Sequence, residues 1–153
     1  MSEVTVVIPN YKGKKYLCAC VDSLFKSTKM ELSVIIVDNA SEDGSIDEVK
    51  QLYPQVRCIM LDKNYGFCRA VNIGIKEADT PFVFLLNNDT LVCKGAVDAL
   101  LMAIRQDDGY FFGGIEDDPV SGSWQAGQCR HILQCTWLGL CPWQGQAGRS
   151  LSE

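Results

Sequence analysis

The sequence is poor in residues that many hydrolytic enzymes need. Among its 153 residues there is one histidine, His131, and there is no Gly-x-Ser-x-Gly turn. Because serine-type hydrolases pair their nucleophile with a histidine, proteases and hydrolases are disfavoured. The Gly-x-x-x-x-Gly-Lys phosphate loop is absent. The first apolar segment does not lead into Gly-x-Gly-x-x-Gly, which disfavours a dinucleotide-binding Rossmann domain.

Long basic blocks and long apolar runs are missing too. The net charge is −5, and the lysines concentrate only at Lys12, Lys14 and Lys15, so we expect no nucleic acid partner. No apolar run approaches the roughly 20 residues that span a bilayer. The N-terminus lacks the charged-then-apolar pattern of a secretion signal. We therefore expect a cytoplasmic protein.

Cysteine is the residue type present in excess, with eight copies. Without a secretion signal, we expect reduced thiols in or near the core rather than disulfides. The cysteines inside apolar patterns are Cys18, Cys20, Cys58, Cys68 and Cys93. The spacing of Cys129, His131, Cys135 and Cys141 loosely resembles a zinc set. It lacks the close Cys-x-x-Cys pairs of common structural sites, so zinc is disfavoured.

Short apolar runs alternate with helical patterns along most of the chain. The expected strands are 4–8, 32–37, 56–61, 82–86 and 110–115. The expected helices are 14–26, one from Ser45 to about Tyr53, 68–78 and 94–106, and Ser45 with Glu48 forms a capping-box pattern. This alternation predicts an α/β fold, a parallel sheet with helices on both faces, within residues 1–115. We expect residues 116–153, rich in Trp, Cys and Gly, to form an irregular tail.

Each of the first four expected strands ends in polar residues. These clusters are Asn10-Tyr11, Asp38-Asn39, Asp62-Lys63-Asn64 and Asn87-Asn88-Asp89. Ligands of open α/β sheets bind beyond the carboxyl ends of the strands, so the four clusters predict a pocket there.

Individual residues of these clusters have two interpretations each. The Asp89 carboxylate suits a hard divalent cation that also holds phosphate oxygens, but Asn-Asp is also a common turn sequence. Asp38 could accept hydrogen bonds from a pyrimidine or ribose, or cap the following loop. Arg69 could contact phosphate or lie in solvent. We expect Lys63 to lie on the surface rather than in the site.

Four segments carry a resemblance to a known family. They are Val4–Tyr11, Ile36–Ser45, Asn64–Phe67 followed by Asn72–Gly74, and Leu85–Thr90. In this order and spacing, over about residues 3–115, the chain resembles family 2 glycosyltransferases of the GT-A fold. The segment Leu85–Thr90 resembles the Asn-x-Asp form of that family's Asp-x-Asp motif, which is common in the rhamnosyltransferase-like branch. The resemblance implies a Rossmann-like, mostly parallel sheet, truncated relative to the full family fold.

The resemblance also implies a ligand and a reaction. The donor would be a nucleotide-diphosphate sugar, a UDP- or dTDP-sugar, used with Mg²⁺ or Mn²⁺ and with inversion at the anomeric carbon. Pro9 and Tyr11 would line the base, and Asp38 would bind the edge of the uracil or thymine.

The remaining site residues follow from the same resemblance. Asn64, Gly66 and Asn72 would border the nucleoside and phosphates. Asn87 would face the ribose or the metal, and Asp89 would coordinate the metal. The amide of Asn87 replaces the first carboxylate of the commoner motif, which lowers the negative charge of the site.

The chain departs from the family pattern after the metal motif. Family members usually continue well beyond it, and that part supplies the acceptor pocket and the catalytic carboxylate. Glu116, Asp117 and Asp118 follow the motif too soon to match that carboxylate, so no catalytic residue is assigned.

Three functional hypotheses stay open. The first is a glycosyltransferase acting on a glycan or lipid-linked acceptor, which would bring it to the membrane periphery. The second is a nucleotide-sugar-binding module that is completed by another chain or by a homodimer through the Trp-rich tail. The third and least favoured is a nucleotidyltransferase, because residues 10–13 match its Gly-rich loop poorly.

Overall fold

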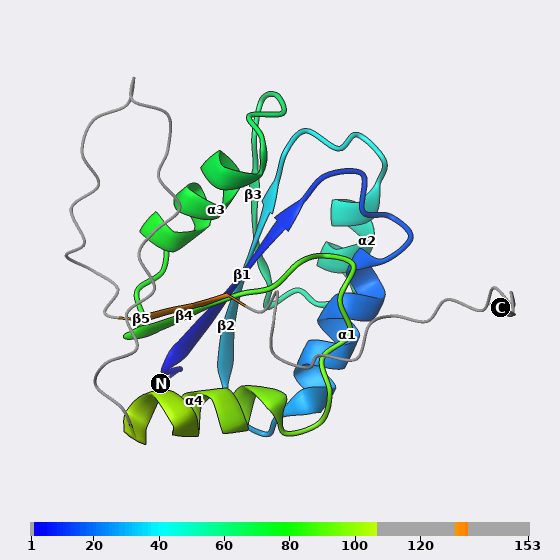
Figure 1. Ribbon diagram of the computed structural model, residues 1–153. Helices are drawn as coiled ribbons and strands as arrows, with labels where there is room; N and C mark the ends of the chain where they lie inside the picture. The colour runs from blue at the N-terminus through cyan, green and yellow to red at the C-terminus, as the bar shows by residue number, and fades with distance from the viewer. Residues whose placement is uncertain (1, 107–130, 135–153) are drawn as a thin grey trace, which may run out of the picture.

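The computed structural model of the chain describes residues 2–106 and 131–134 (Figure 1). Helices and strands alternate through these ranges. In chain order they are β1 (Val4–Asn10), α1 (Leu17–Ser27), β2 (Leu32–Asp38), α2 (Ser45–Leu52), β3 (Arg57–Met60), α3 (Phe67–Lys76), β4 (Phe82–Leu85), α4 (Ala96–Gln106) and β5 (His131–Gln134).

The strands form one sheet in the order β3-β2-β1-β4-β5, and all neighbouring strands are parallel. Val4 of β1 pairs with Leu32 of β2 and with Phe82 of β4, so the three central strands begin at the same edge. Every residue of β1 is buried, which explains its unbroken apolar sequence. The predicted α/β class with a parallel sheet is confirmed.

Helices cover both faces of the sheet, as predicted. Helix α3 lies on the opposite side of the sheet from α1 and α2 (Figure 1). Helices α1, α2 and α4 share a core with the β1 side chains Val6 and Ile8, whereas α3 packs on Val7. Leu17 and Leu24 of α1 have no exposed surface. Burial of each contributes about 1.5–3 kcal/mol to the stability of the fold.

One predicted helix start and one predicted helix cap are wrong in detail. Helix α1 begins at Leu17 rather than Lys14, because the chain first makes a turn in which the amide of Leu17 donates to the Gly13 carbonyl, at 2.9 Å. The capping box of Ser45 does not form. Gly44 is the N-cap of α2, and glycine has no side chain that could make a capping bond. Instead, the carboxylate of Asp43 accepts the Ser45 amide at 2.9 Å.

The expectation of an irregular tail is wrong at residues 131–134, which form β5 against β4. Four residues are too few to show a sequence period, and this strand is defined by pairing with the β4 edge. The predicted strand at residues 110–115 lies outside the described residues. So do Cys129, Cys135 and Cys141 of the disfavoured zinc set.

The cysteines in the described part are unbridged, as predicted for reduced thiols. Cys20 is buried, and the others are partly buried: Cys18, Cys58, Cys68 and Cys93. Within the same part of the chain, none of the helices has the length and apolar character needed to cross a bilayer.

Candidate functional site

A pocket of about 370 Å³ lies at the carboxyl ends of the central strands, the edge where the sequence predicts one. The lining residues come from the end of β1 and the residue after it, from the segments after β2, β3 and β4, and from the start of α3. They are Pro9, Asn10, Tyr11, Asn39, Asn64, Gly66, Phe67, Asn87, Asn88 and Asp89. The volume falls within the range of small-molecule sites.

The structure brings most of the predicted site residues together. Those that line the pocket are Pro9, Tyr11, Asn64, Gly66, Asn87 and Asp89. Asp38 and Asn72 do not line it. They are 1% and 4% exposed, respectively, and Asp38 lies behind the lining residue Asn10, which donates to it.

The Asp38 carboxylate is engaged by groups of the protein itself. One oxygen accepts the Asn10 side-chain amide at 2.7 Å and also the Ser41 hydroxyl. The other oxygen accepts the Ser41 backbone amide at 2.9 Å. Asp38 therefore shapes the loop after β2, as in the capping alternative, and its contact with a nucleobase stays a prediction.

Asn10 lines the pocket, and the sequence reasoning gave it no role of its own. Its Nδ2 donates to Asp38 and lies within hydrogen-bond distance of Ser41 Oγ (3.2 Å) and Ser45 Oγ (3.1 Å). Its Oδ1 accepts Nδ2 of Asn88 at 2.8 Å. One buried amide thus connects the ends of β1, β2 and β4 with the start of α2. In the sequence, the only signal for this role is the position of Asn10 in a polar cluster at the end of a strand.

Gly13 leaves room for this amide contact. A Cβ at position 13 would overlap Asn10 Oδ1 and lie 2.6 Å from Asn88 Nδ2. We therefore expect Gly13→Ala to separate Asn10 from Asn88. Overpacking should cost about 1–3 kcal/mol of unfolding free energy. Urea denaturation measures this loss, and hydrogen exchange of residues 87–90 shows whether the loop after β4 has moved.

Gly74→Ala is the matched control for that substitution. Its added methyl would overlap Val7 Cγ1 and lie 3.2 Å from Val37 Cγ2, where α3 packs on the sheet. Both variants should lose stability, but only Gly13→Ala should raise exchange in residues 87–90 out of proportion to that loss. Equal exchange in the two variants would refute a specific effect on the Asn10–Asn88 contact.

Amide side chains also hold the loop that leads into α3. Asn39 Nδ2 donates to the Gly66 carbonyl and its Oδ1 accepts the Tyr65 amide, both at 3.2 Å. Asn64 Oδ1 accepts the Gly66 amide at 2.8 Å. Gly66 has φ +88°, a conformation that favours glycine, and it is the N-cap of α3. The positive end of the α3 dipole therefore lies at the pocket, where it favours an anion.

The loops after β1 and β2 contain backbone strain. Lys12, Ala40 and Glu42 have φ values of 53°, 55° and 50°, which non-glycine residues seldom adopt. The Ser41 hydroxyl, which accepts the Lys12 amide at 3.0 Å, joins these two loops. Strained residues held by surrounding contacts are characteristic of ligand-binding sites.

Among the residues that the structure describes, Asp89 is the only Asp, Glu, Lys or Arg that lines the pocket. Arg69 is exposed and contacts the ring of Tyr65 at 4.2 Å, which agrees with its solvent alternative rather than with a place in the pocket. Lys63 is also exposed, as predicted, and lies 5.0 Å from the same ring. The Tyr65 hydroxyl donates to Asp62, which raises the pKa of Tyr65. Within the described ranges, no side-chain cation is thus placed to neutralise an anionic ligand in the pocket.

Solved structures share the fold. S. aureus TarS 1-349 is 25% identical, with a TM-score of 0.62 over 69% of this chain and 33% of that chain. The same protein in complex with UDP-GlcNAc has a TM-score of 0.63 at 23% identity, over 82% of this chain and 37% of that chain. This likeness agrees with the expected GT-A-type fold.

Curated relatives and a family model agree with the fold. A teichoic acid poly(glycerol phosphate) polymerase of Staphylococcus epidermidis is 29% identical over 71% of this chain and 16% of its own length. The glycosyltransferase GlyG of Streptococcus pneumoniae is 30% identical over 71% of this chain and 37% of its own length. The chain therefore spans well under half the length of these two relatives. The model of glycosyl transferase family 2 matches residues 5–137, so the chain belongs to this family.

Proposed function

We propose that the chain forms the donor-binding part of a metal-dependent, inverting glycosyltransferase that uses a nucleotide-diphosphate sugar. The observation that carries this proposal is the pocket at the strand ends of a family 2 chain, with exposed aromatic side chains, several amides and one carboxylate in its lining. The aromatic rings suit a nucleobase, and the amides suit the polar groups of the base and the ribose. The carboxylate suits a cation that also holds a diphosphate.

The aromatic side chains suit the nucleobase. Tyr11 and Phe67 both line the pocket and are 45% and 43% exposed. Stacking of a base on such a ring contributes about 1–3 kcal/mol. The amides of Asn39 and Asn64 lie in the same lining and can orient polar groups of the nucleoside. TarS was solved with UDP-GlcNAc and with UDP, which supports a uridine nucleotide as the first donor to test.

The other part of the pocket suits a diphosphate with a divalent cation. Asp89 and Asn87 offer carboxylate and amide oxygens, the hard ligands that Mg²⁺ and Mn²⁺ prefer. No cluster of three potential His, Cys, Asp or Glu ligands exists among residues 2–106. Phosphate oxygens and water would complete the coordination. The bound cation would neutralise the diphosphate as it leaves the sugar.

Inversion needs a general base beside the acceptor hydroxyl. We assign that role to no residue of the described part, and Glu116, Asp117 and Asp118 lie outside it. The acceptor, a glycan or a lipid-linked sugar, stays a prediction from the resemblance. Homodimer formation and the cytoplasmic location likewise stay predictions.

Calorimetric titration with UDP in Mn²⁺ and in EDTA tests the proposal. We expect binding that requires the cation, and weaker, cation-independent binding of uridine, which lacks the diphosphate. Titration with dTDP reports the base preference. Absence of UDP binding in Mn²⁺ would refute the donor site.

Incubation with UDP-sugars and Mn²⁺ separates the two main hypotheses. Release of UDP supports an active glycosyltransferase. Tight UDP binding without release of UDP from any sugar donor tested, with or without an added acceptor, supports the binding-module alternative.

A further inference from the structure

The segment that carries Asp89, residues 86–95 between β4 and α4, is fastened to α1 from behind the pocket. Cys20 Sγ donates to the Asn87 carbonyl at 3.4 Å, two residues before Asp89. The Val92 amide donates to Ser23 Oγ at 2.9 Å, three residues after Asp89. The Gly95 amide donates to the Ser27 carbonyl at 2.6 Å. These α1 residues do not line the pocket.

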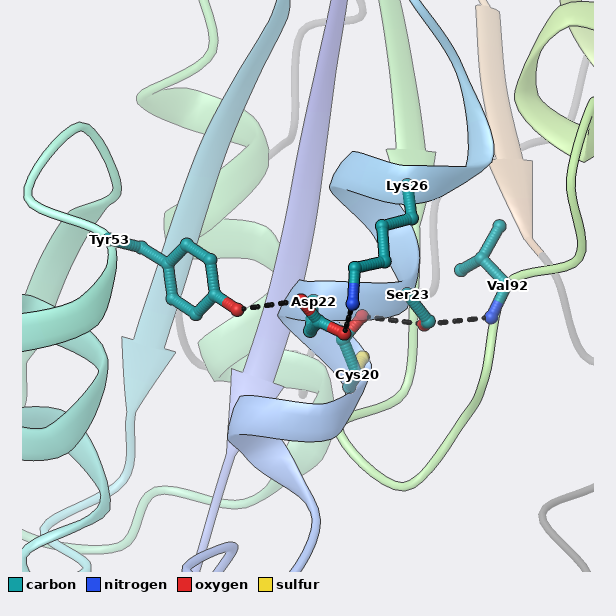
Figure 2. A network of polar contacts seen from close by, with 6 residues as sticks. All are labelled: Cys20, Asp22, Ser23, Lys26, Tyr53 and Val92. Atoms are coloured by element: carbon teal, nitrogen blue, oxygen red, sulfur yellow. Dashed lines mark hydrogen bonds and ion pairs between the residues drawn. The ribbon is translucent and has the colours of Figure 1, made fainter.

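Ser23 is the side chain at the centre of this attachment (Figure 2). Its hydroxyl donates to the Cys20 carbonyl at 2.8 Å and accepts the Val92 amide. The first bond orients the oxygen, so that a lone pair is available to the loop. Val92 itself is 6% exposed and belongs to the core on this face of the sheet.

Helix α1 is itself held in place. Figure 2 shows Asp22 between Lys26 of the same helix (2.7 Å) and the hydroxyl of Tyr53, which follows α2 (3.1 Å). The rings of Phe25 and Tyr53 stack with centroids 5.6 Å apart. The loop of residues 86–95 is therefore bound to a helix that packs on both the sheet and the segment after α2.

The Cys20 thiol is a stable donor in this arrangement. Cys20 has no exposed surface, so water does not compete for the bond between its Sγ and the Asn87 carbonyl.

We propose that Ser23 is a positioning residue that holds the Asp89 carboxylate where it can meet the cation. The proposal rests on the proposed function for the role of Asp89. Asp89 is exposed, so its place depends on the backbone on either side of it. Metal-binding side chains must be held within about 0.5 Å of their working position, and bonds on both sides of Asp89 supply that restraint.

Ser23→Ala tests the proposal, with Ser27→Ala as the matched control. Both serines donate to a carbonyl three residues earlier on α1, Ser23 to Cys20 and Ser27 to Leu24. Only Ser23 uses its side chain to accept a loop amide, because Ser27 contacts the loop through its backbone carbonyl, which alanine retains. Ser23→Thr keeps the hydroxyl and serves as the conservative variant.

We expect Ser23→Ala to raise the hydrogen-exchange rate of the Val92 amide about 3- to 10-fold, the effect of one lost hydrogen bond. The Kd for UDP with Mn²⁺ should rise by a similar factor, while the Kd for uridine stays unchanged. Ser27→Ala and Ser23→Thr should leave the Val92 exchange rate and both Kd values near those of the parent protein.

Unchanged Val92 exchange in Ser23→Ala, or an equal change in Ser27→Ala, would overturn the proposal. So would faster Val92 exchange with an unaltered Kd for UDP and Mn²⁺. If the parent protein does not bind UDP with Mn²⁺, the proposed function fails and the positioning role fails with it. The exchange experiment would still report whether Ser23 anchors the loop, so the two failures are distinguishable.

Discussion

Asp89→Ala should abolish the Mn²⁺-dependent part of UDP binding and leave the protein folded. Within the described part of the chain, Asp89 is the only Asp, Glu, Lys or Arg in the pocket lining, and it is exposed, so its removal leaves no buried group unsatisfied. Loss of a charged ligand group should cost about 2 kcal/mol or more, which raises the Kd at least ~30-fold. Titrations with UDP in Mn²⁺ and in EDTA measure the effect, and thermal unfolding confirms the fold.

Two further variants sharpen this experiment. Asp89→Asn keeps the shape of the side chain without its charge, and we expect nearly the same loss. Asp62→Asn removes another exposed carboxylate, which accepts the Tyr65 hydroxyl but does not line the pocket. We expect its UDP affinity to stay within a factor of about two of the parent value. If Asp89→Ala retained full Mn²⁺-dependent binding, the cation would not be held at this residue.

Asp38→Ala should produce the largest loss of folding stability among the site variants. The substitution leaves the Asn10 amide and both donors of Ser41 without their carboxylate acceptor, in a place where Asp38 is 1% exposed. Unsatisfied buried donors cost about 1–3 kcal/mol each, and partial relaxation makes a total of about 3 kcal/mol reasonable. The free energy of unfolding from urea denaturation checks this value.

Asp43→Ala is the control, because Asp43 also accepts two backbone amides, those of Lys14 and Ser45, each at 2.9 Å. It is less buried than Asp38, so water can replace the carboxylate, and we expect a loss of about 1 kcal/mol. Equal losses in the two variants would contradict the role of Asp38 as the buried centre of the strand-end loops. A uridine titration of folded Asp38→Ala tests its predicted contact with the base.

Local sequence was sufficient for the order and type of the elements from β1 to α4, though not for their exact ends or for β5, and for the chemistry at the strand ends. The apolar run from Val4 to Ile8 is a strand because β1 lies in the middle of the sheet, with every residue buried. Tyr11, Asn64 and Asp89 were found because polar residues that follow such runs collect at one edge of a parallel sheet. This rule needs no knowledge of which strands are neighbours.

The partners of individual polar groups could not be predicted in the same way. Asn10 contacts Asp38, 28 positions later, and Asn88, 78 positions later. Ser23 accepts the amide of Val92 from 69 positions away. No local pattern identifies such pairs, because the sequence around a serine or asparagine does not show whether its side chain lies in a turn, in a helix or in a buried contact.

The sequence by itself determined that this chain forms a parallel α/β sheet of the family 2 glycosyltransferase type with a polar pocket at one edge. Apolar periodicity and strand-end chemistry are local properties, and they suffice for the sheet and the pocket, whereas the family follows from the resemblance of four ordered motifs. Only the tertiary structure decided that Asp38 lies behind the pocket, that Asn10 links three strand ends, and that α1 supports the Asp89 loop. Those roles depend on which distant groups reach hydrogen-bond distance after the strands have paired.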